Sequence, residues 1–400
     1  MEKLRWIPNQ LPAFEEDDCL LMDPLRIAQV RAFHESIPGY LPTPLHSMQH
    51  TAAALGLGGL YVKDESKRFG LNAFKVLGSS YAIARYAAQK TGREMGQIVF
   101  QTLTDPQLKR EMGETVFFTA TDGNHGRGVA WAANRLGQRA VVRMPAGTAM
   151  SRLENIRKEG AEVTIEAMNY DDCVRLAAQQ AVKTPGGVLM QDTAWEGYEQ
   201  IPGWIMQGYG TMAAEAADQL PEPPTHVFLQ AGVGSLAGAV AGYLVKRYPD
   251  GPPRIIVVEA AAADCHYRSA LRGDGQTAVV EGEMPTMMAG LACGEPNPLS
   301  WRILRRHAGA FVSCPDWVSA LGMRMLAAPA AGDPAMVSGE SGAVGMGLVA
   351  AIMQGSSGLK EALGMDKTSR VLLFSTEGDT DPVNYCRIVR DGVRSFETEQ

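Results

Sequence analysis

The sequence predicts an α/β protein in which parallel β-sheets carry helices on both faces. Short runs rich in β-branched and aromatic residues alternate with helical stretches from about residue 59 to the end, and such alternation is typical of parallel sheets. Of the 400 residues, 46% are hydrophobic, so the chain can bury a large core. A chain of this length usually forms two domains.

The predicted elements follow one another in a regular order. A strand over residues 59–65 precedes an alanine-rich helix over 79–89, and a strand over 115–121 precedes an apolar helical run over 129–136. Further short β-rich runs, separated by helical stretches, extend the pattern at residues 140–144, 162–166, 188–191, 226–230, 254–259 and 370–374.

The charge balance and the cysteines exclude several classes of function. The formal net charge is −7, and there is no basic face or tail, so neither nucleic acid nor an anionic membrane is an expected partner. No apolar run reaches the roughly 18 to 20 residues of a membrane helix, and the first residues lack the apolar core of a signal peptide, so we expect a cytoplasmic protein. Neither the cysteines nor the histidines have the spacing of metal ligands, so we expect no metal.

Lys75 is the first candidate for chemistry. It lies between the strand over 59–65 and the helix over 79–89, in the run Phe69-Gly-Leu-Asn-Ala-Phe-Lys-Val-Leu-Gly78. A buried lysine at the mouth of a sheet can hold an aldehyde cofactor as a Schiff base, because burial lowers the pKa of its amine. Most lysines that open a helix are solvated, so Lys75 alone does not decide the function.

Three loops that follow predicted strands strengthen this hypothesis. Asp122-Gly-Asn-His-Gly-Arg-Gly128 brings backbone and the Asn124 side chain close to a ligand. Ala231-Gly-Val-Gly-Ser-Leu-Ala-Gly238 opens a helix whose first N–H groups suit a phosphate, although a plain strand-to-helix turn has the same pattern. Ser375-Thr-Glu-Gly-Asp-Thr380 offers hydroxyl groups to a ring nitrogen.

Together and in this order, the motifs resemble the tryptophan synthase β-like family, the fold-type II enzymes that use pyridoxal 5′-phosphate. The resemblance runs from Thr43-Pro-Leu45 through Tyr61-Val-Lys-Asp-Glu-Ser66 to the loop at 375, so it covers most of the chain. It implies a homodimer and two parallel-sheet domains with the cofactor in the cleft between them. The large domain would comprise residues 1–84 and 191–400, and a small α/β domain of residues 85–190 would be inserted into it.

Two departures narrow the resemblance. Dehydratases of the family usually have Ser or Ala directly before Gly-Asn-His, where this chain has Asp122, and an arginine where it has Leu77. With Gln191-Asp-Thr-Ala-Trp-Glu-Gly-Tyr198 and Met288-Ala-Gly-Leu-Ala-Cys-Gly-Glu-Pro-Asn297, these departures resemble the ammonia-lyases that act on 2,3-diaminopropionate. The resemblance therefore implies α,β-elimination of this small amino acid, as D- or L-isomer, to pyruvate and two ammonia.

The resemblance also assigns the cofactor contacts. Lys75 would hold the aldehyde carbon, Asn124 the phenolate oxygen, and Ser375 or, failing it, Thr376 the ring nitrogen, with Glu340 beside the ring. The phosphate would lie on backbone N–H groups of a loop that we call the phosphate cradle: Gly232, Val233, Gly234 and Ser235, with Leu236 completing the turn.

Two carboxylates complete the predicted site. A cationic substrate side chain needs acidic neighbours, and Asp122 and Asp192 fit that need as ionic partners and as proton acceptors. Asp122 could instead be the N-cap of a helix, and Asp192 a turn former. Nearby, His125 is expected to organise its loop rather than act as a base, and Tyr170 to lie at the surface where a helix starts.

Several alternatives stay open. A serine or threonine dehydratase, or a racemase, would share the fold, but a neutral substrate hydroxyl gains little from a carboxylate at position 122. A non-catalytic amino-acid sensor would keep the fold without needing Lys75. A nicotinamide oxidoreductase would carry Gly-x-Gly-x-x-Gly in a first βαβ unit, which this chain lacks. The sequence does not decide whether Cys265 and Cys293 form a disulfide.

Overall fold

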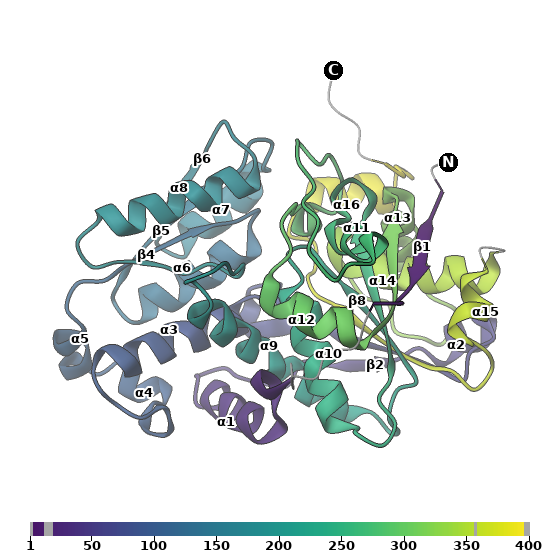
Figure 1. The fold of residues 1–400 in the computed structure, drawn as a ribbon, viewed down its shortest axis with the longest axis horizontal. Coiled ribbons are helices and arrows are strands. Elements are labelled where there is room, and N and C mark those ends of the chain that lie inside the picture. The colour runs from purple at the N-terminus through teal and green to yellow at the C-terminus, as the bar shows by residue number, and fades with distance from the viewer. Residues whose placement is uncertain (1–2, 12–18, 356–357, 396–400) are drawn as a thin grey trace.

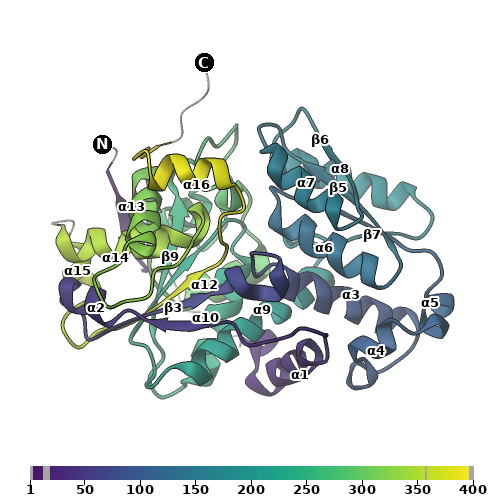
Figure 2. The same ribbon diagram turned by 180° about the vertical axis from the view of Figure 1, so that it is seen from behind.

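The computed structural model describes residues 3–11, 19–355 and 358–395. In this part of the chain the strands form one seven-stranded and one four-stranded sheet. Figures 1 and 2, which view the molecule from opposite sides, show the two sheets in separate lobes that lie next to each other. Among the described helices, none has the length and apolar character needed to cross a membrane.

The larger sheet has the strand order β1-β10-β9-β8-β11-β3-β2. Its inner strands run parallel, whereas β1 and β2 at the two edges are antiparallel to their neighbours. The strands of this sheet are β1 (Arg5–Pro8), β2 (Leu45–Ser47), β3 (Gly59–Asp64), β8 (His226–Gln230), β9 (Arg254–Ala260), β10 (Ala308–Cys314) and β11 (Arg370–Ser375). The sequence pattern predicted four of these and missed β1, β2 and β10.

The smaller sheet has the order β6-β5-β4-β7 and is parallel throughout. Its strands and its flanking helices are β4 (Val116–Ala120), α6 (Asn124–Arg135), β5 (Arg139–Met144), α7 (Met150–Lys158), β6 (Glu162–Ile165), α8 (Tyr170–Lys183) and β7 (Gly187–Leu189). All of them fall within residues 85–190, the range expected for the inserted domain; its boundaries stay a prediction.

Helices cover both faces of the larger sheet. Successive residues of a strand point to opposite faces, so Val227 and Leu229 of β8 enter one core and Phe228 enters the other. All five residues of β8 are buried, which is typical of parallel strands covered on both sides.

Each core has its own set of helices. The first core includes buried residues of α1 (Pro24–Glu35), α3 (Val76–Lys90), α4 (Phe100–Leu103), α5 (Pro106–Met112), α9 (Gln200–Gln219), α10 (Ser235–Arg247), α11 (Cys265–Arg272) and α12 (Pro298–His307). The second includes α2 (Gln49–Leu55), α13 (Asp316–Ala327), α14 (Glu340–Gln354), α15 (Leu359–Leu363) and α16 (Pro382–Val389).

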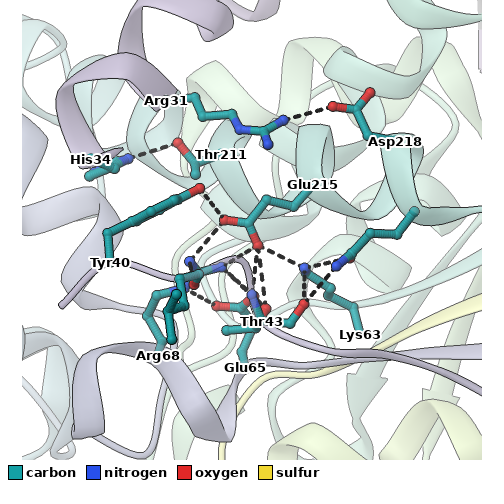
Figure 3. Close-up of polar contacts among 12 residues, drawn as sticks. Arg31, His34, Tyr40, Thr43, Lys63, Glu65, Arg68, Thr211, Glu215 and Asp218 are labelled. Atoms are coloured by element: carbon teal, nitrogen blue, oxygen red, sulfur yellow. Dashed lines mark hydrogen bonds and ion pairs between the residues drawn. The ribbon is translucent and has the colours of Figure 1, made fainter. Parts of the chain in front are cut away.

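A buried cluster of charges joins β3 and the turn after it to helix α9. Lys63 Nζ donates to Glu215 Oε2 at 2.7 Å, and Arg68 Nη2 donates to the same oxygen and to Glu65 Oε1 at 2.8 Å each. These four side chains are at most 1% exposed. Figure 3 shows Lys63 and Arg68 converging on Glu215, with Glu65 on the other side of Arg68. The cluster therefore anchors the segment that leads from the sheet to Lys75.

Removing the central carboxylate of this cluster should destabilise the fold strongly. We expect Glu215→Gln to lower the free energy of unfolding by about 3 to 5 kcal/mol, because it removes the buried carboxylate that Lys63 and Arg68 share. Urea unfolding checks this. Asp218→Asn, on the same helix, is the matched control: its pair with Arg31 is half exposed, so we expect a loss of less than about 1 kcal/mol. Equal losses in the two variants would contradict the role of the buried cluster.

The contribution of Glu215 should also depend on pH. Burial alone would raise the pKa of Glu215, but the hydrogen bonds and charges of Arg68 and Lys63 hold it well below its ordinary value of 4.5. A carboxyl whose pKa is lowered by folding stabilises the fold above the unfolded pKa and loses this effect as the pH falls through the folded one. The difference between wild type and Glu215→Gln should therefore shrink below about pH 4.5.

Candidate functional site

The predicted site residues meet where parallel strands of both sheets end. Asp122 follows β4, Asp192 follows β7, Thr376 follows β11, and the phosphate cradle follows β8. Ligands of α/β proteins bind at such carboxyl ends. These residues line one cavity, which we call the Lys75 cavity; its lining is Phe74, Lys75, Thr121, Asp122, Asn124, His125, Tyr170, Asp192, residues 230–236, residues 289–291, Cys293, Ser341, Thr376 and Glu377.

Lys75 forms an ion pair inside this cavity. Its Nζ donates to Asp192 Oδ2 at 2.5 Å, and 21% of the Lys75 side chain is exposed. Burial alone would lower the pKa of Lys75, but the charge and hydrogen bond of Asp192, together with the charges of Tyr209 and Asp122, outweigh it and raise the pKa above the ordinary value. The expectation of a lowered pKa was therefore wrong: Asp192 holds the amine as an ammonium ion. The amine gains a free lone pair only after its proton moves, and Asp192 is the acceptor in contact.

Asp192 is ionised and lies close to His125 of helix α6 as well as to Lys75. Burial would raise the pKa of Asp192, but the charges of Lys75 and then His125 lower it to about 2. Nδ1 of His125 lies 3.9 Å from Asp192 Oδ2. Nε2 of His125 donates to the backbone oxygen of Met190 at 2.8 Å, which ties this histidine to the segment that carries Asp192. This hydrogen bond is consistent with the expectation that His125 organises its loop rather than acts as a base.

Tyr170 starts helix α8, as expected, but its side chain is half-buried and lines the Lys75 cavity, so the expectation that it lies at the surface was only partly right. Its hydroxyl accepts from Gln191 Nε2 at 2.7 Å and lies 3.4 Å from Asp192 Oδ1. Burial, reinforced by the charge of Asp192, raises the pKa of Tyr170 well above its ordinary value. In the sequence, Tyr170 follows the N-cap Asn169 at the start of α8, a position that usually faces solvent. The residues that bury it come from the end of β7, which the local pattern does not reveal.

The phosphate cradle has the geometry that its glycines suggested. Gly234 has φ +94° and precedes Ser235, the first residue of α10. A Cβ on Gly234 would lie 2.4 Å from His266 Nε2, so only glycine fits here. The first N–H groups of a helix lack partners within the helix and attract anions. Ser235 Oγ donates to the backbone oxygen of Asp192 at 2.5 Å, which joins the cradle to the Lys75 pair.

Asp122 is not a helix cap. Helix α6 begins at Asn124 with Gly123 as its N-cap residue and no capping side chain. Instead, Asp122 Oδ2 accepts from Arg152 Nη1 at 3.0 Å. Asn124, on the same turn, donates through Nδ2 to Glu377 Oε2 at 2.5 Å. Glu377 is 2% exposed and lines the Lys75 cavity, yet nothing in the loop sequence distinguished it from its hydroxyl neighbours.

Two of the predicted ring contacts lie outside the lining of the Lys75 cavity. Ser375 is fully buried, and its Oγ donates to Ser338 Oγ at 2.8 Å. Its alternative, Thr376, does line the cavity, where its Oγ1 accepts from Gln230 Nε2 at 3.1 Å. Glu340 faces a second cavity, and the next residue, Ser341, lines the Lys75 cavity.

This second cavity, the outer cavity, has a volume of about 800 Å³. Its lining is Asp122, residues 145–152, Asn169, Tyr170, residues 283–287, Ala289, Ala292, Glu340, Asp381, Val383, Asn384, Arg387, Val393 and Ser395. Asp122, Tyr170 and Ala289 line both cavities and so form the junction between them. Burial raises the pKa of Glu340 to about 7, although Arg152 opposes this shift.

The cysteines form no disulfide, and three residues near the phosphate cradle are candidate metal ligands. All six cysteines are free, so Cys265 and Cys293 are not joined. Among the described residues, Glu259, Cys265 and His266 are close enough to share a metal ion, a group that the sequence spacing did not suggest. Glu259 Oε1 already accepts from the backbone N–H of His266 and contacts His266 Nδ1 at 2.9 Å.

The chain is similar to known proteins over nearly its whole length. Residues 37–374 match the model of a family described as pyridoxal-phosphate dependent enzyme. A diaminopropionate ammonia-lyase of Salmonella typhimurium is 53% identical over 91% of this chain and 92% of its own length. That of Escherichia coli K12 is 52% identical over 90% of each chain.

Solved structures agree with these relatives. The crystal structure of Escherichia coli diaminopropionate ammonia lyase in complex with D-serine matches with a TM-score of 0.91 and 47% identity, covering 98% of both chains. The same enzyme with an aminoacrylate-PLP azomethine reaction intermediate matches with a TM-score of 0.89. A threonine deaminase from Solanum lycopersicum, at 19% identity and a TM-score of 0.73, shares the fold.

Proposed function

The chain belongs to the pyridoxal-phosphate dependent enzyme family, and from this premise we propose that it removes ammonia from D- and L-2,3-diaminopropionate. It is an ammonia-lyase with pyridoxal 5′-phosphate as cofactor, of the tryptophan synthase β-like fold. Membership of this family excludes the nicotinamide oxidoreductase hypothesis. The observation that carries the substrate proposal is Asp122, a carboxylate at the junction of the two cavities where dehydratases have a small neutral residue.

The Lys75 cavity fits the cofactor. Lys75 presents its amine between the two sheets, and the phosphate cradle presents a helix start at which Gly234 admits no side chain. When bound, pyridoxal 5′-phosphate acts as an electron sink that weakens the bonds at the α-carbon of the amino acid. Its proposed ligands are Lys75, Asn124, Gly232, Val233, Gly234, Ser235, Leu236 and Thr376, and we add Glu377, which lines the same cavity. Ser375 is buried outside this lining, and Glu340 faces the outer cavity.

The phosphate cradle gives a direct test of cofactor binding. Gly234→Asp should weaken the affinity for pyridoxal 5′-phosphate by about 100-fold or more, because it places bulk and negative charge beside the phosphate dianion and strains the backbone at φ +94°. Dialysis followed by absorbance of the retained cofactor measures this. Gly251→Asp, in a surface turn with open space around it, is the control. Unchanged retention in Gly234→Asp would rule the cradle out.

The two cavities suit a substrate with a second amino group. The outer cavity carries the carboxylates of Glu283, Glu340 and Asp381 in addition to Asp122, against the two arginines Arg152 and Arg387, and this surplus of acidic groups favours a cation. A β-ammonium group already carries its proton, so it leaves as ammonia without a strong general acid. Asp122, as a proton acceptor, would take the proton from the α-carbon. The Cα–H electron pair then forms the Cα–Cβ double bond as the Cβ–N bond breaks.

The function is tested by the products formed from a panel of amino acids. The purified protein, loaded with pyridoxal 5′-phosphate, should release pyruvate and two ammonia per molecule of D- or L-2,3-diaminopropionate. It should do so faster than it releases pyruvate from D- or L-serine, because the serine hydroxyl needs a proton donor to leave. Faster turnover of serine or threonine would identify a dehydratase instead, and a yellow protein without turnover would identify a sensor.

The assembly and the cellular location are further proposals. We propose a homodimer, as the resemblance implies, and size-exclusion chromatography with light scattering tests it. We propose a cytoplasmic protein, supported by the pattern of charge and hydropathy in the sequence, and fractionation of the source cells tests that. The inserted domain of residues 85–190 is supported by the smaller sheet, whose strands all fall within it.

A further inference from the structure

Arg152 is placed where its charge is unfavourable unless partners from elsewhere stabilise it. It lies in the first turn of α7, where the helix dipole disfavours a cation, and its side chain is only 6% exposed. Burying a guanidinium costs several kcal/mol unless carboxylates and hydrogen bonds offset that cost. The charge of Arg152 must therefore be stabilised by groups outside helix α7.

The partners of Arg152 come from the site. Its Nη1 donates to Asp122 Oδ2 at 3.0 Å, and its Nη2 lies 3.9 Å from Glu340 Oε2 on α14 of the larger lobe. Burial lowers the pKa of Arg152, but the charges of Glu377, Asp122, Glu340 and Asp381 outweigh it and raise the pKa, so the guanidinium stays charged.

The stem of Arg152 covers the turn that carries Asp122. A Cβ on Gly123 would lie 3.2 Å from Arg152 Cδ, so the two segments are packed together. Asp122 lines both cavities, whereas Arg152 lines only the outer one. The guanidinium therefore approaches Asp122 from the outer side and occupies one of its two carboxylate oxygens, Oδ2.

We propose that Arg152 is a positioning residue that fixes the carboxylate of Asp122 at the junction of the two cavities, ready to accept the α-proton of the D-substrate. The proposal rests on the proposed function and concerns only the geometry of its base. The hydrogen bond from the guanidinium to Oδ2 fixes the orientation of the Asp122 carboxylate toward the substrate. The breaking Cα–H bond gives its proton to the Asp122 carboxylate, and its electron pair forms the Cα–Cβ double bond as ammonia leaves.

The test compares both isomers in variants of Arg152. A base misplaced by about 1 Å can cost about 100-fold in rate, so Arg152→Met should lower kcat for the D-isomer by about 10- to 100-fold and leave KM nearly unchanged. Its kcat for the L-isomer should fall less than about three-fold, because the α-hydrogen of that isomer points in the opposite direction and we propose Lys75 as its base. Arg152→Lys keeps the positive charge but loses the planar guanidinium, so it should restore part of the D-activity.

Arg143→Met is the matched control. Arg143 is also a buried arginine of the smaller lobe, where it contacts Gln180, Thr164 and Glu162, and it lines neither cavity. It should leave the ratio of D- to L-activity unchanged. Thermal unfolding and cofactor retention, measured on every variant, show whether a substitution destabilises the fold or the holoenzyme. If Arg152→Met does not fold, Arg152→Lys is compared with the wild-type protein instead.

A double-mutant cycle separates positioning from a structural role. If Arg152 acts through Asp122, then Arg152→Met in an Asp122→Asn background should cause no further loss of D-activity. Equal losses for both isomers, or losses that add to those of Asp122→Asn, would overturn the proposal. The proposed function fails separately, if wild-type protein releases pyruvate from neither isomer.

Discussion

Lys75→Ala protein is expected to form pyruvate from neither isomer of 2,3-diaminopropionate, with a loss of at least about 10⁴-fold, and to lack the visible absorbance of the bound aldehyde cofactor. Lys75 is the one lysine among the described residues that line its cavity, and its Nζ contacts Asp192. No other amine in that lining can replace it as the group that holds the aldehyde.

Borohydride reduction gives a readout of this prediction that does not depend on turnover. Reduction of the wild-type protein should fix the cofactor on Lys75, as peptide mapping would show, and Lys75→Ala should take up no label. Lys90→Ala, at the exposed end of the same helix α3, should keep both the label and the activity. A label on any other lysine would overturn the assignment of the whole site.

The inner strands could be predicted because burial on both faces gives them a continuous apolar run. Residues 226–230 were predicted as a strand, and β8 has these bounds. The edge strands β1 and β2 have only four and three residues and are half buried, so no clear pattern distinguishes them. Strand β10 begins directly after helix α12, and without a turn between the two the sequence shows no break.

The loops that carry the site could be predicted because each is a local motif after a strand. What could not be predicted arises from contacts between distant segments. Asp192 is 117 residues from Lys75 in the chain, yet its contact reverses the expected shift of the lysine's pKa. Arg152, Tyr170 and Glu377 join the site through partners on other elements, and a surface-like sequence surrounds each of them.

Asp122 and Lys75 reach the Lys75 cavity from different elements, which bears on the stereochemistry of the reaction. Asp122 follows β4 and pairs with Arg152, whereas Lys75 precedes α3 and pairs with Asp192. If the carboxylates of D- and L-substrates are held alike, their α-hydrogens point in opposite directions. Two opposite hydrogens need two bases, and we propose that Asp122 serves the D-isomer and Lys75 the L-isomer, while Asp192 holds or deprotonates the substrate from the cavity wall.

Asp122→Asn should therefore lose much more activity with D- than with L-2,3-diaminopropionate. Removing a general base costs about 10² to 10⁴ in rate, and asparagine keeps the size of the side chain while losing its basicity. The measurement is pyruvate formed per second at saturating concentrations of each isomer. Glu283→Gln, which removes a carboxylate of the outer cavity, should leave the ratio of the two rates unchanged. Equal losses for the two isomers in Asp122→Asn would show that Asp122 binds substrate or supports the turn, and that a single base serves both.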